Sequence, residues 1–155
     1  MQHLRDLIED ANRKISTADH LVYMTYPMLR DPKLIMKIAE NIEEAMRSAI
    51  EAVVYYDRLY KRIQPTGEEF TSKYYAFKSS CAKRYNIQGE HILAFEDLRK
   101  LIMDHKESPT SFVKGDAIVI CADHFRNVRQ VSFDKVKNFL NTAKQFILKA
   151  NQIVR

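Results

Sequence analysis

Arg99 and His105, whose side chains are of kinds that can take part in catalysis, stand six positions apart in the stretch LRKLIMDHKESP at residues 98–109. Six helical residues span about 600°, so the two side chains project about 120° apart and do not stack as an i, i+4 pair would. His105 shares a helix face with Leu101 and Ile102. The pair therefore either forms a functional site or consists of a solvated arginine and a helix-end histidine that is hydrogen-bonded in the core.

A basic and aromatic stretch between Tyr55 and Tyr85 suggests another chemistry, the binding of single-stranded nucleic acid. It contains eight of the sixteen Tyr and Phe residues, and in such sites cations follow phosphates while aromatic faces stack on bases. The candidate nucleic-acid-binding residues are Arg58, Lys61, Arg62, Lys73, Lys78, Lys83, Arg84 and, further along the chain, Lys100. In the alternative interpretation, helical spacing already places Tyr74 and Phe77 in the core. Of the adjacent Tyr74 and Tyr75, only one ring can point fully inward, and the other could reach a ligand.

The net charge of +5 at pH 7 is unevenly placed along the chain. Residues 58–84 hold seven Lys or Arg against two Glu, whereas residues 40–57 hold five acids against one base. Such a dipolar distribution suits an anionic partner on one surface. The alternative is a mixed and solvated surface.

Metal and phosphate-loop chemistry have little support in the sequence. It has no CxxC, HExxH or Glu-x-x-His pattern, and its three glycines form neither a Walker loop nor a dinucleotide fingerprint. Cys121 and His124 have a ligand-like spacing, but one pair across a turn does not make a metal site. Glutamates cluster at residues 40–44, and Arg47, four residues after Glu43, favours a solvent-facing group. We therefore expect no metal and no cofactor.

The cysteine content and the N-terminus bear on the compartment. Cys81 and Cys121 are the only cysteines, and they resemble free thiols of a reducing compartment rather than a disulfide framework. The N-terminal MQHLRDLIEDANRK lacks the apolar core of a signal peptide. No segment approaches eighteen uninterrupted apolar residues. We expect a cytoplasmic protein that does not enter a membrane.

Apolar residues recurring at three- and four-residue steps predict five helices. The predicted helices cover residues 2–28, about 32–63, about 68–85, about 90–106 and 132–154. Asp31 is expected to cap the second helix, with Pro32 at its first position. The segment QPTG at residues 64–67 should end that helix, and Ser132 should cap the last one.

Between the fourth and last helices, a β-branched run and a second alternating run predict a short hairpin of residues 117–121 and 127–131. The predicted fold class is mainly α, a single domain over residues 1–155. It is an up-and-down helical bundle of about five helices with one short β-hairpin before the C-terminal helix, and more than about 60% of its residues are helical. The apolar seam of the last helix runs through three heptads and would pack within the bundle or against a second copy of the chain.

The sequence also resembles a known family. Arg99-x5-His105 falls within the Arg-x4–6-His pattern of HEPN (higher eukaryotes and prokaryotes nucleotide-binding) domains. The stretch AENIEEAMRSAIEAVVYY at residues 39–56 resembles the Ala/Glu-rich part of that family's second helix. The resemblance covers roughly residues 5–107 and implies two long antiparallel N-terminal helices and a homodimer with both motifs in the cleft between subunits. Where catalytic members commonly have asparagine after the arginine, this chain has Lys100.

The HEPN resemblance implies RNA or nucleotide binding and, in active relatives, metal-independent RNA cleavage. In such a reaction His105 would transfer protons near neutral pH, and Arg99 would hold the non-bridging phosphate oxygens. A hypothesis of another class is a non-catalytic helical dimerisation or protein-interaction module. Whether the chain is an enzyme stays open between these two.

Overall fold

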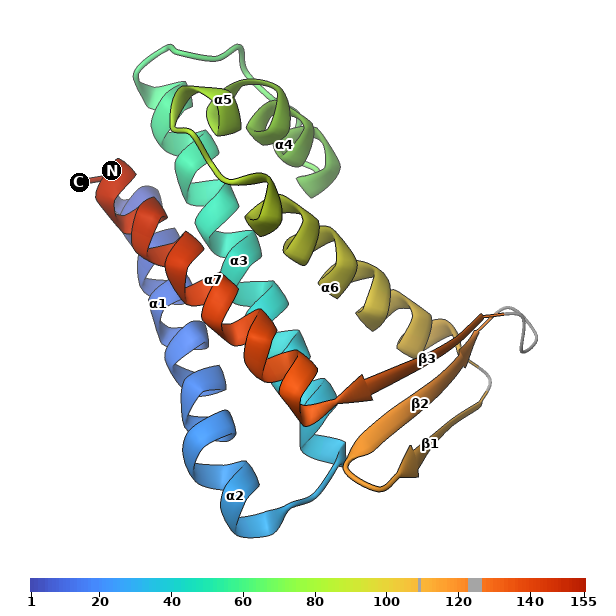
Figure 1. The fold of residues 1–155 in the computed structure, drawn as a ribbon. Coiled ribbons are helices and arrows are strands. Elements are labelled where there is room, and N and C mark those ends of the chain that lie inside the picture. Colours follow the sequence, from blue (N-terminus) through green and yellow to red (C-terminus); the bar gives the residue numbers. More distant parts are fainter. Residues whose placement is uncertain (109, 123–126) are drawn as a thin grey trace.

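The computed structural model describes residues 1–108, 110–122 and 127–155 (Figure 1). Of these residues 74% are helical, in five helical rods that accompany a three-stranded sheet, which confirms the predicted mainly α bundle. The first rod comprises α1 (Gln2–His20), a π-helical turn (Leu21–Thr25) and α2 (Tyr26–Leu29), and the second is α3 (Lys33–Leu59). The third comprises α4 (Phe70–Ala76), a π-helical turn (Phe77–Cys81) and α5 (Ala82–Arg84), and the last two are α6 (Gly89–Glu107) and α7 (Phe133–Ile153).

The long helix α3 begins at Lys33, one residue later than predicted, and ends earlier, at Leu59 rather than near residue 63. Soon after it, Lys61 adopts a φ of 57°, a left-handed conformation that a helix cannot continue through. At the other end, Asp31 Oδ1 accepts a hydrogen bond from the backbone N–H of Lys33 at 3.0 Å. Pro32 directly precedes the first helical residue. The chain therefore turns away from the bundle axis before it reaches QPTG.

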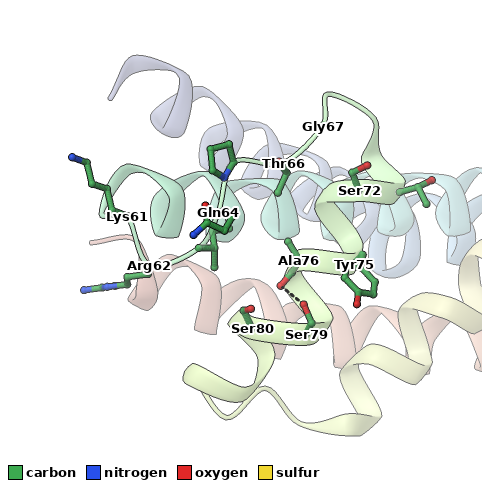
Figure 2. Close-up of a pocket in the computed structure, with 13 residues that line it drawn as sticks. Lys61, Arg62, Gln64, Thr66, Gly67, Ser72, Tyr75, Ala76, Ser79 and Ser80 are labelled. Atoms are coloured by element: carbon green, nitrogen blue, oxygen red, sulfur yellow. Dashed lines mark hydrogen bonds between the residues drawn. The ribbon is translucent and has the colours of Figure 1, made fainter.

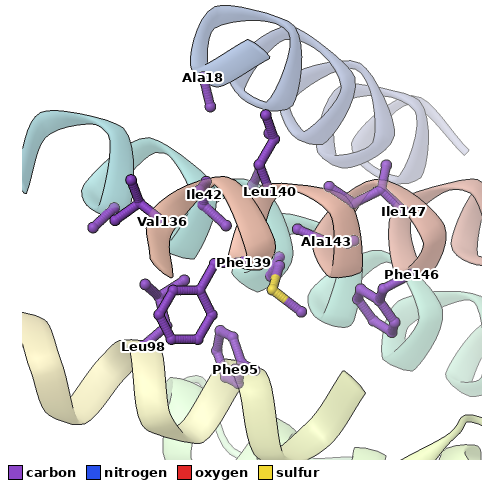
Figure 3. Packing of buried hydrophobic residues seen from close by; sticks show 14 of the residues in the cluster. Ala18, Ile42, Phe95, Leu98, Val136, Phe139, Leu140, Ala143, Phe146 and Ile147 are labelled. Carbon is purple, nitrogen blue, oxygen red and sulfur yellow. The ribbon is translucent and has the colours of Figure 1, made fainter. Parts of the chain in front are cut away.

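Helix α3 lies in the middle of the bundle, with α1 and α6 on either side and α7 crossing in front of it (Figure 1). Ala11 and Ala18 of α1 are fully buried, and their small side chains let α1 approach α3 closely. The apolar residues of α7 point toward α1, α3 and α6, and Leu140 and Ala143 have no exposed surface (Figure 3). The seam of the last helix is therefore used inside the chain's own core. Ser132 caps this helix as predicted, accepting from the Lys135 N–H at 3.2 Å.

The sheet differs from the predicted hairpin by one strand. Strands β2 (Ala117–Ala122) and β3 (Asn127–Ser132) pair antiparallel as predicted, and β1 (Thr110–Lys114) pairs with the other edge of β2. All five residues of β1 are exposed, so TSFVK shows no alternation of buried and exposed positions, and periodicity could not detect it. Gly115 begins the two-residue turn between β1 and β2 with a φ of 63°, which glycine adopts without strain.

Candidate functional site

The C-terminal end of α3 holds a buried carboxylate, Asp57, that binds four side chains from later parts of the chain. Asp57 has no exposed surface. Arg84 Nη1 donates to its Oδ2 at 2.5 Å, Cys81 Sγ donates to the same oxygen at 3.2 Å, and the Tyr85 hydroxyl donates to Oδ1. Arg62 Nη1 lies 3.6 Å from Oδ1. Because a buried charge is stable only when it is paired and hydrogen-bonded, Asp57 fixes the chain after α3 and the α4–α5 rod against α3.

This carboxylate also changes the acid–base behaviour of its neighbours. Burial raises the pKa of the Cys81 thiol to about 12, and the hydrogen bond to Asp57 adds to the rise. The pKa of Tyr85 is raised to about 12 for the same two reasons, burial being the larger. At neutral pH both groups are therefore uncharged donors, so Cys81 serves as a structural thiol and lacks the thiolate character of a nucleophile.

Next to this network, residues 61–67 and the outer face of the α4–α5 rod form a pocket of about 790 Å³ (Figure 2). We call it the hydroxyl pocket. Its polar lining consists of Lys61, Arg62, Gln64 and the hydroxyl-bearing Thr66, Thr71, Ser72, Tyr75, Ser79 and Ser80. None of the described residues that line it is acidic. The hydroxyl pocket therefore offers an anionic ligand cations and hydrogen-bonding groups without a repelling carboxylate.

Local backbone features shape the hydroxyl pocket. The left-handed Lys61 turns the chain across the end of the bundle. A Cβ at Gly67 would lie 3.1 Å from the Ser72 Oγ, so glycine lets the loop approach the first turn of α4 closely. The π-helical turn Phe77–Cys81 supplies Ser79, and π-helical turns within α-helices are frequent at functional sites.

Exposed tyrosine rings lie in and beside the hydroxyl pocket. Tyr75 lines it and is 75% exposed, whereas the ring centroid of its neighbour Tyr74 lies 5.4 Å from that of buried Phe95. This is the inward and outward arrangement expected for two adjacent aromatic residues. Tyr60 is 56% exposed, and the Arg62 Cζ lies 5.3 Å from its ring centroid. Exposed aromatic faces of this kind can stack a base.

Seven of the eight candidate nucleic-acid-binding cations surround this end of the bundle, in two groups. Those paired with carboxylates are Arg62 and Arg84 with Asp57, Lys73 with Glu51, and Lys78 with Glu96, at N···O distances of 2.5 to 3.8 Å. Arg58, Lys61 and Lys83 are exposed, and no carboxylate of the described residues lies within 4.0 Å of them. We call these three the unpaired cations. Their charge is available to an external anion.

Lys100 lies apart from the other seven cations. It lines a smaller pocket of about 240 Å³ in which Arg129 of β3 binds two acids of α6. Arg129 Nη2 donates to Asp97 at 2.6 Å, and its Nη1 donates to Asp104 at 3.3 Å. The carboxylates in this pocket make it a poor place for a phosphate, and Lys100 does not join the surface around the hydroxyl pocket.

Arg99 is held by the protein's own side chains. Its Nε lies 3.7 Å from Glu43 Oε1, and its Cζ lies 4.9 Å from the ring centroid of Phe70 and 5.7 Å from that of Phe95. Arg47 Nη2 donates to the same Glu43 oxygen at 2.7 Å. Glu43 is only 6% exposed, so the expectation that it faces solvent is wrong. The guanidinium groups of Arg47 and Arg99, which also lie over the Phe70 ring, neutralise the buried carboxylate.

His105 is neither in the core nor beside Arg99. Its side chain is half-buried, so the alternative of a histidine hydrogen-bonded in the core is wrong. The residue lies in the last turn of α6, where the helix leaves the centre of the bundle for the sheet (Figure 1). The helical rise separates it from Arg99 by about 9 Å along the axis. Within one copy of the chain, the side chains of Arg99 and His105 therefore do not meet at a single point.

The buried histidine of this protein is His91, which sequence reasoning did not select. It is 5% exposed, and its ring centroid lies 6.1 Å from that of Phe146. Neither ring nitrogen has a hydrogen-bond partner among the described residues. Its position four residues before Phe95, on the apolar stripe of α6, was the available signal. A buried imidazole without partners lowers stability.

Within residues 1–108, 110–122 and 127–155, no helix has the length and apolar character that crossing a membrane requires. In the same ranges, no three His, Cys, Asp or Glu side chains are grouped so that they could share a metal ion; the Cys121–His124 pair involves a residue outside them. Comparisons with protein-family models, curated proteins and solved structures return no match to this chain.

Proposed function

We propose that this protein binds RNA or a nucleotide at the end of the bundle formed by the hydroxyl pocket and the unpaired cations. The observation that carries the proposal is the combination of a pocket without acidic residues, three cations without carboxylate partners and exposed tyrosine rings. Phosphates need cations, and unpaired bases need flat apolar faces with polar groups beside them. The surface offers all of these within one part of the molecule.

The number of unpaired cations predicts how strongly the affinity for RNA depends on salt. When cations neutralise phosphates of a single strand, the logarithm of affinity falls with the logarithm of salt concentration with a slope of about −0.7 per contact. Arg58, Lys61 and Lys83 together predict a slope of about −2. The affinity for a single-stranded RNA should then fall about 20-fold between 50 and 200 mM salt.

A charge-matched pair of triple variants tests this proposal. The first variant combines Arg58→Gln, Lys61→Gln and Lys83→Gln, and the second combines Lys33→Gln, Lys37→Gln and Lys106→Gln at the opposite end of the bundle. Both lose three positive charges. Fluorescence anisotropy against salt should show a flattened slope only for the first. An equal loss in both, or a flat salt response of the wild type, would refute binding at this surface.

The second candidate is the non-catalytic interaction module, including the homodimer that the family resemblance implies. Exposed apolar residues support it, notably Tyr23, Met24, Met28 and Leu29 at the far end of the first rod. The seam of α7 no longer supports it, because that seam is buried within one chain. If sedimentation shows a dimer and RNA does not bind, this candidate takes the place of the first.

RNA cleavage by Arg99 and His105 is the enzymatic form of the first proposal. The contacts of Arg99 argue for binding without cleavage, because its guanidinium group is already engaged by Glu43 and two aromatic rings. Holding a phosphorane would require Arg99 to leave these partners. We therefore place the function at the hydroxyl pocket and treat α6 as its scaffold.

A further inference from the structure

The arrangement of groups along the hydroxyl pocket narrows the class of ligand. Lys61 and Arg62 project from the end of the pocket where α3 stops, and Tyr75 lies toward the opposite end (Figure 2). Hydroxyl side chains, among them Thr66 and Ser79, lie between them. A ligand that satisfies this order is anionic at one end, flat and apolar at the other, and polar along its edge.

The size of the pocket agrees with one such unit. Its volume of about 790 Å³ falls within the range of about 300–1,000 Å³ that small-molecule sites occupy. One nucleotide has a phosphate, a flat base and a polar base edge. Hydroxyl groups donate as well as accept hydrogen bonds, so a lining of this composition accepts the edge of any of the four bases.

We propose that the hydroxyl pocket receives an unpaired base of a single-stranded RNA, with the base against the ring of Tyr75 and the adjoining phosphate at Lys61. The inference rests on the proposed function and adds that the bound RNA is single-stranded. A base within a duplex is already stacked and paired, so it presents neither a free face to Tyr75 nor a free edge to the hydroxyl groups. The unpaired cations would still attract a duplex, through its phosphates alone.

Single substitutions at Tyr75 test the stacking contact directly. Tyr75→Ala should weaken binding of a single-stranded RNA about 5- to 150-fold, which corresponds to about 1–3 kcal/mol. Tyr75→Phe should restore binding to within about twofold, because it keeps the aromatic face. Tyr23→Ala, at an exposed tyrosine of the far end of the first rod, serves as the matched control and should bind as the wild type does. With 75% of Tyr75 exposed, these substitutions leave the core untouched.

The RNA used decides between stacking and simple charge attraction. Fluorescence anisotropy should be measured with one RNA sequence as a single strand and as a perfect duplex, at one salt concentration. We expect Tyr75→Ala to change the affinity for the single strand only. Cross-linking of the wild type to RNA that contains 4-thiouridine should mark residues 60–80.

The outcomes separate this inference from the proposed function. If the wild type binds RNA with the expected salt response but Tyr75→Ala equals the wild type, the surface binds phosphates and the stacking pocket is refuted. Equal effects of Tyr75→Ala on single strand and duplex, or cross-links only outside residues 60–80, refute it as well. If the wild type shows no salt-dependent RNA binding at all, the proposed function fails and this inference fails with it.

Discussion

Two buried carboxylates on α3, Glu43 and Asp57, each engage two arginines, yet their surroundings differ. At Glu43, the guanidinium carbons of Arg47 and Arg99 lie 5.2 Å and 4.9 Å from the ring centroid of Phe70. At Asp57, the arginines remain at the surface of the bundle end, next to the unpaired cations. The same pairing of one acid with two arginines thus completes the core in the first region. In the second it anchors a surface with excess positive charge.

This difference shows that the type and spacing of a charged residue do not reveal whether its charge is available. Arg99 belongs to the recognisable Arg-x5-His spacing, but Glu43 of another helix lies 3.7 Å from it. Lys61 belongs to no motif, yet it has no carboxylate partner among the described residues and lines the hydroxyl pocket. Contacts between helices decide whether the charge of a side chain is available to an external anion. The cations that such contacts leave unpaired predict where an anion binds.

The largest effect that we expect comes from Asp57→Asn. Removing the charge leaves Arg62 and Arg84 without their common partner and should lower the free energy of unfolding by about 2–3 kcal/mol. That is less than the 3–5 kcal/mol of a fully buried pair, because both arginines keep contact with water. At about 2–4 °C per kcal/mol, the midpoint of thermal unfolding should fall by about 5–10 °C.

Glu43→Gln is the matched substitution in the other cluster. We expect a loss of about 1–2 kcal/mol, because each arginine keeps an aromatic face when the carboxylate is gone. Circular dichroism melts of both variants under one set of conditions give the comparison. A larger loss for Glu43→Gln than for Asp57→Asn would reverse the assignment of Asp57 as the stronger anchor.

Alkaline pH should weaken the Asp57 region through Cys81. The folded protein keeps the thiol proton up to a pKa of about 12, whereas the unfolded chain releases it near pH 9. The contribution of this group is therefore complete below about pH 9 and falls by about 1.4 kcal/mol per pH unit above it, or about 2 kcal/mol by pH 10.5. Tyr85 acts in the same direction.

Urea unfolding between about pH 8 and 10.5 measures this loss. Cys81→Ser is the control, because serine keeps a donor for Asp57 but does not titrate in this range. Its stability should fall less steeply with pH than that of the wild type. Equal slopes would mean that the thiol does not hold its proton in the folded state.

Much of the fold could be predicted from the sequence, and the exceptions have local causes. Helices with a continuous apolar stripe and a side-chain cap, such as the one that Ser132 begins, appear where periodicity placed them. Strand β1 was missed because an edge strand exposed on both faces has no periodicity to detect. The end of α3 was misplaced because the left-handed Lys61 has no signature in its side chain.

The site was less predictable than the fold. The basic and aromatic stretch overlaps the hydroxyl pocket, whose lining runs from Lys61 to Ser80, and its role in nucleic-acid binding stays a prediction. The burial of Asp57 and Glu43 could not be foreseen, because each has a partner on another helix, Arg84 and Arg99 respectively. His91 was detectable, because it occupies an apolar position of α6 that periodicity had already outlined.

His91→Phe should stabilise the protein by about 1 kcal/mol, a gain that contrasts with the losses at both acids. The imidazole nitrogens are buried without partners, and replacing such a group by an apolar one of similar shape removes a desolvation penalty. A cavity of about 10 Å³ beside the ring leaves some room for the larger phenyl group. The melting midpoint should rise by about 2–4 °C, and a fall would indicate that His91 has a bound partner such as a water molecule.

The smallest effect that we expect is that of His105→Ala, and it decides whether α6 has any role beyond scaffolding. His105 is half-buried in the last helical turn, so its removal should change stability by no more than about 0.5 kcal/mol. It lies at the opposite end of α6 from the hydroxyl pocket, so RNA binding should stay within about twofold of the wild type. Arg99→Ala should by contrast lower the melting midpoint by about 2–4 °C, because Glu43 loses one of its two cations.

Incubation of RNA with wild type, His105→Ala, Arg99→Ala and the exposed control Lys106→Ala tests catalysis alongside these melts. If α6 is only a scaffold, any RNA degradation in the preparations is the same for all four proteins. Cleavage that leaves 2′,3′-cyclic phosphates, persists in EDTA and disappears in both variants but not in the control would contradict this. His105 would then be the proton-transfer group. Arg99 would have to leave Glu43 during the reaction. The catalytic site would then lie at the Glu43 cluster, where the arginine charges are already paired with a carboxylate.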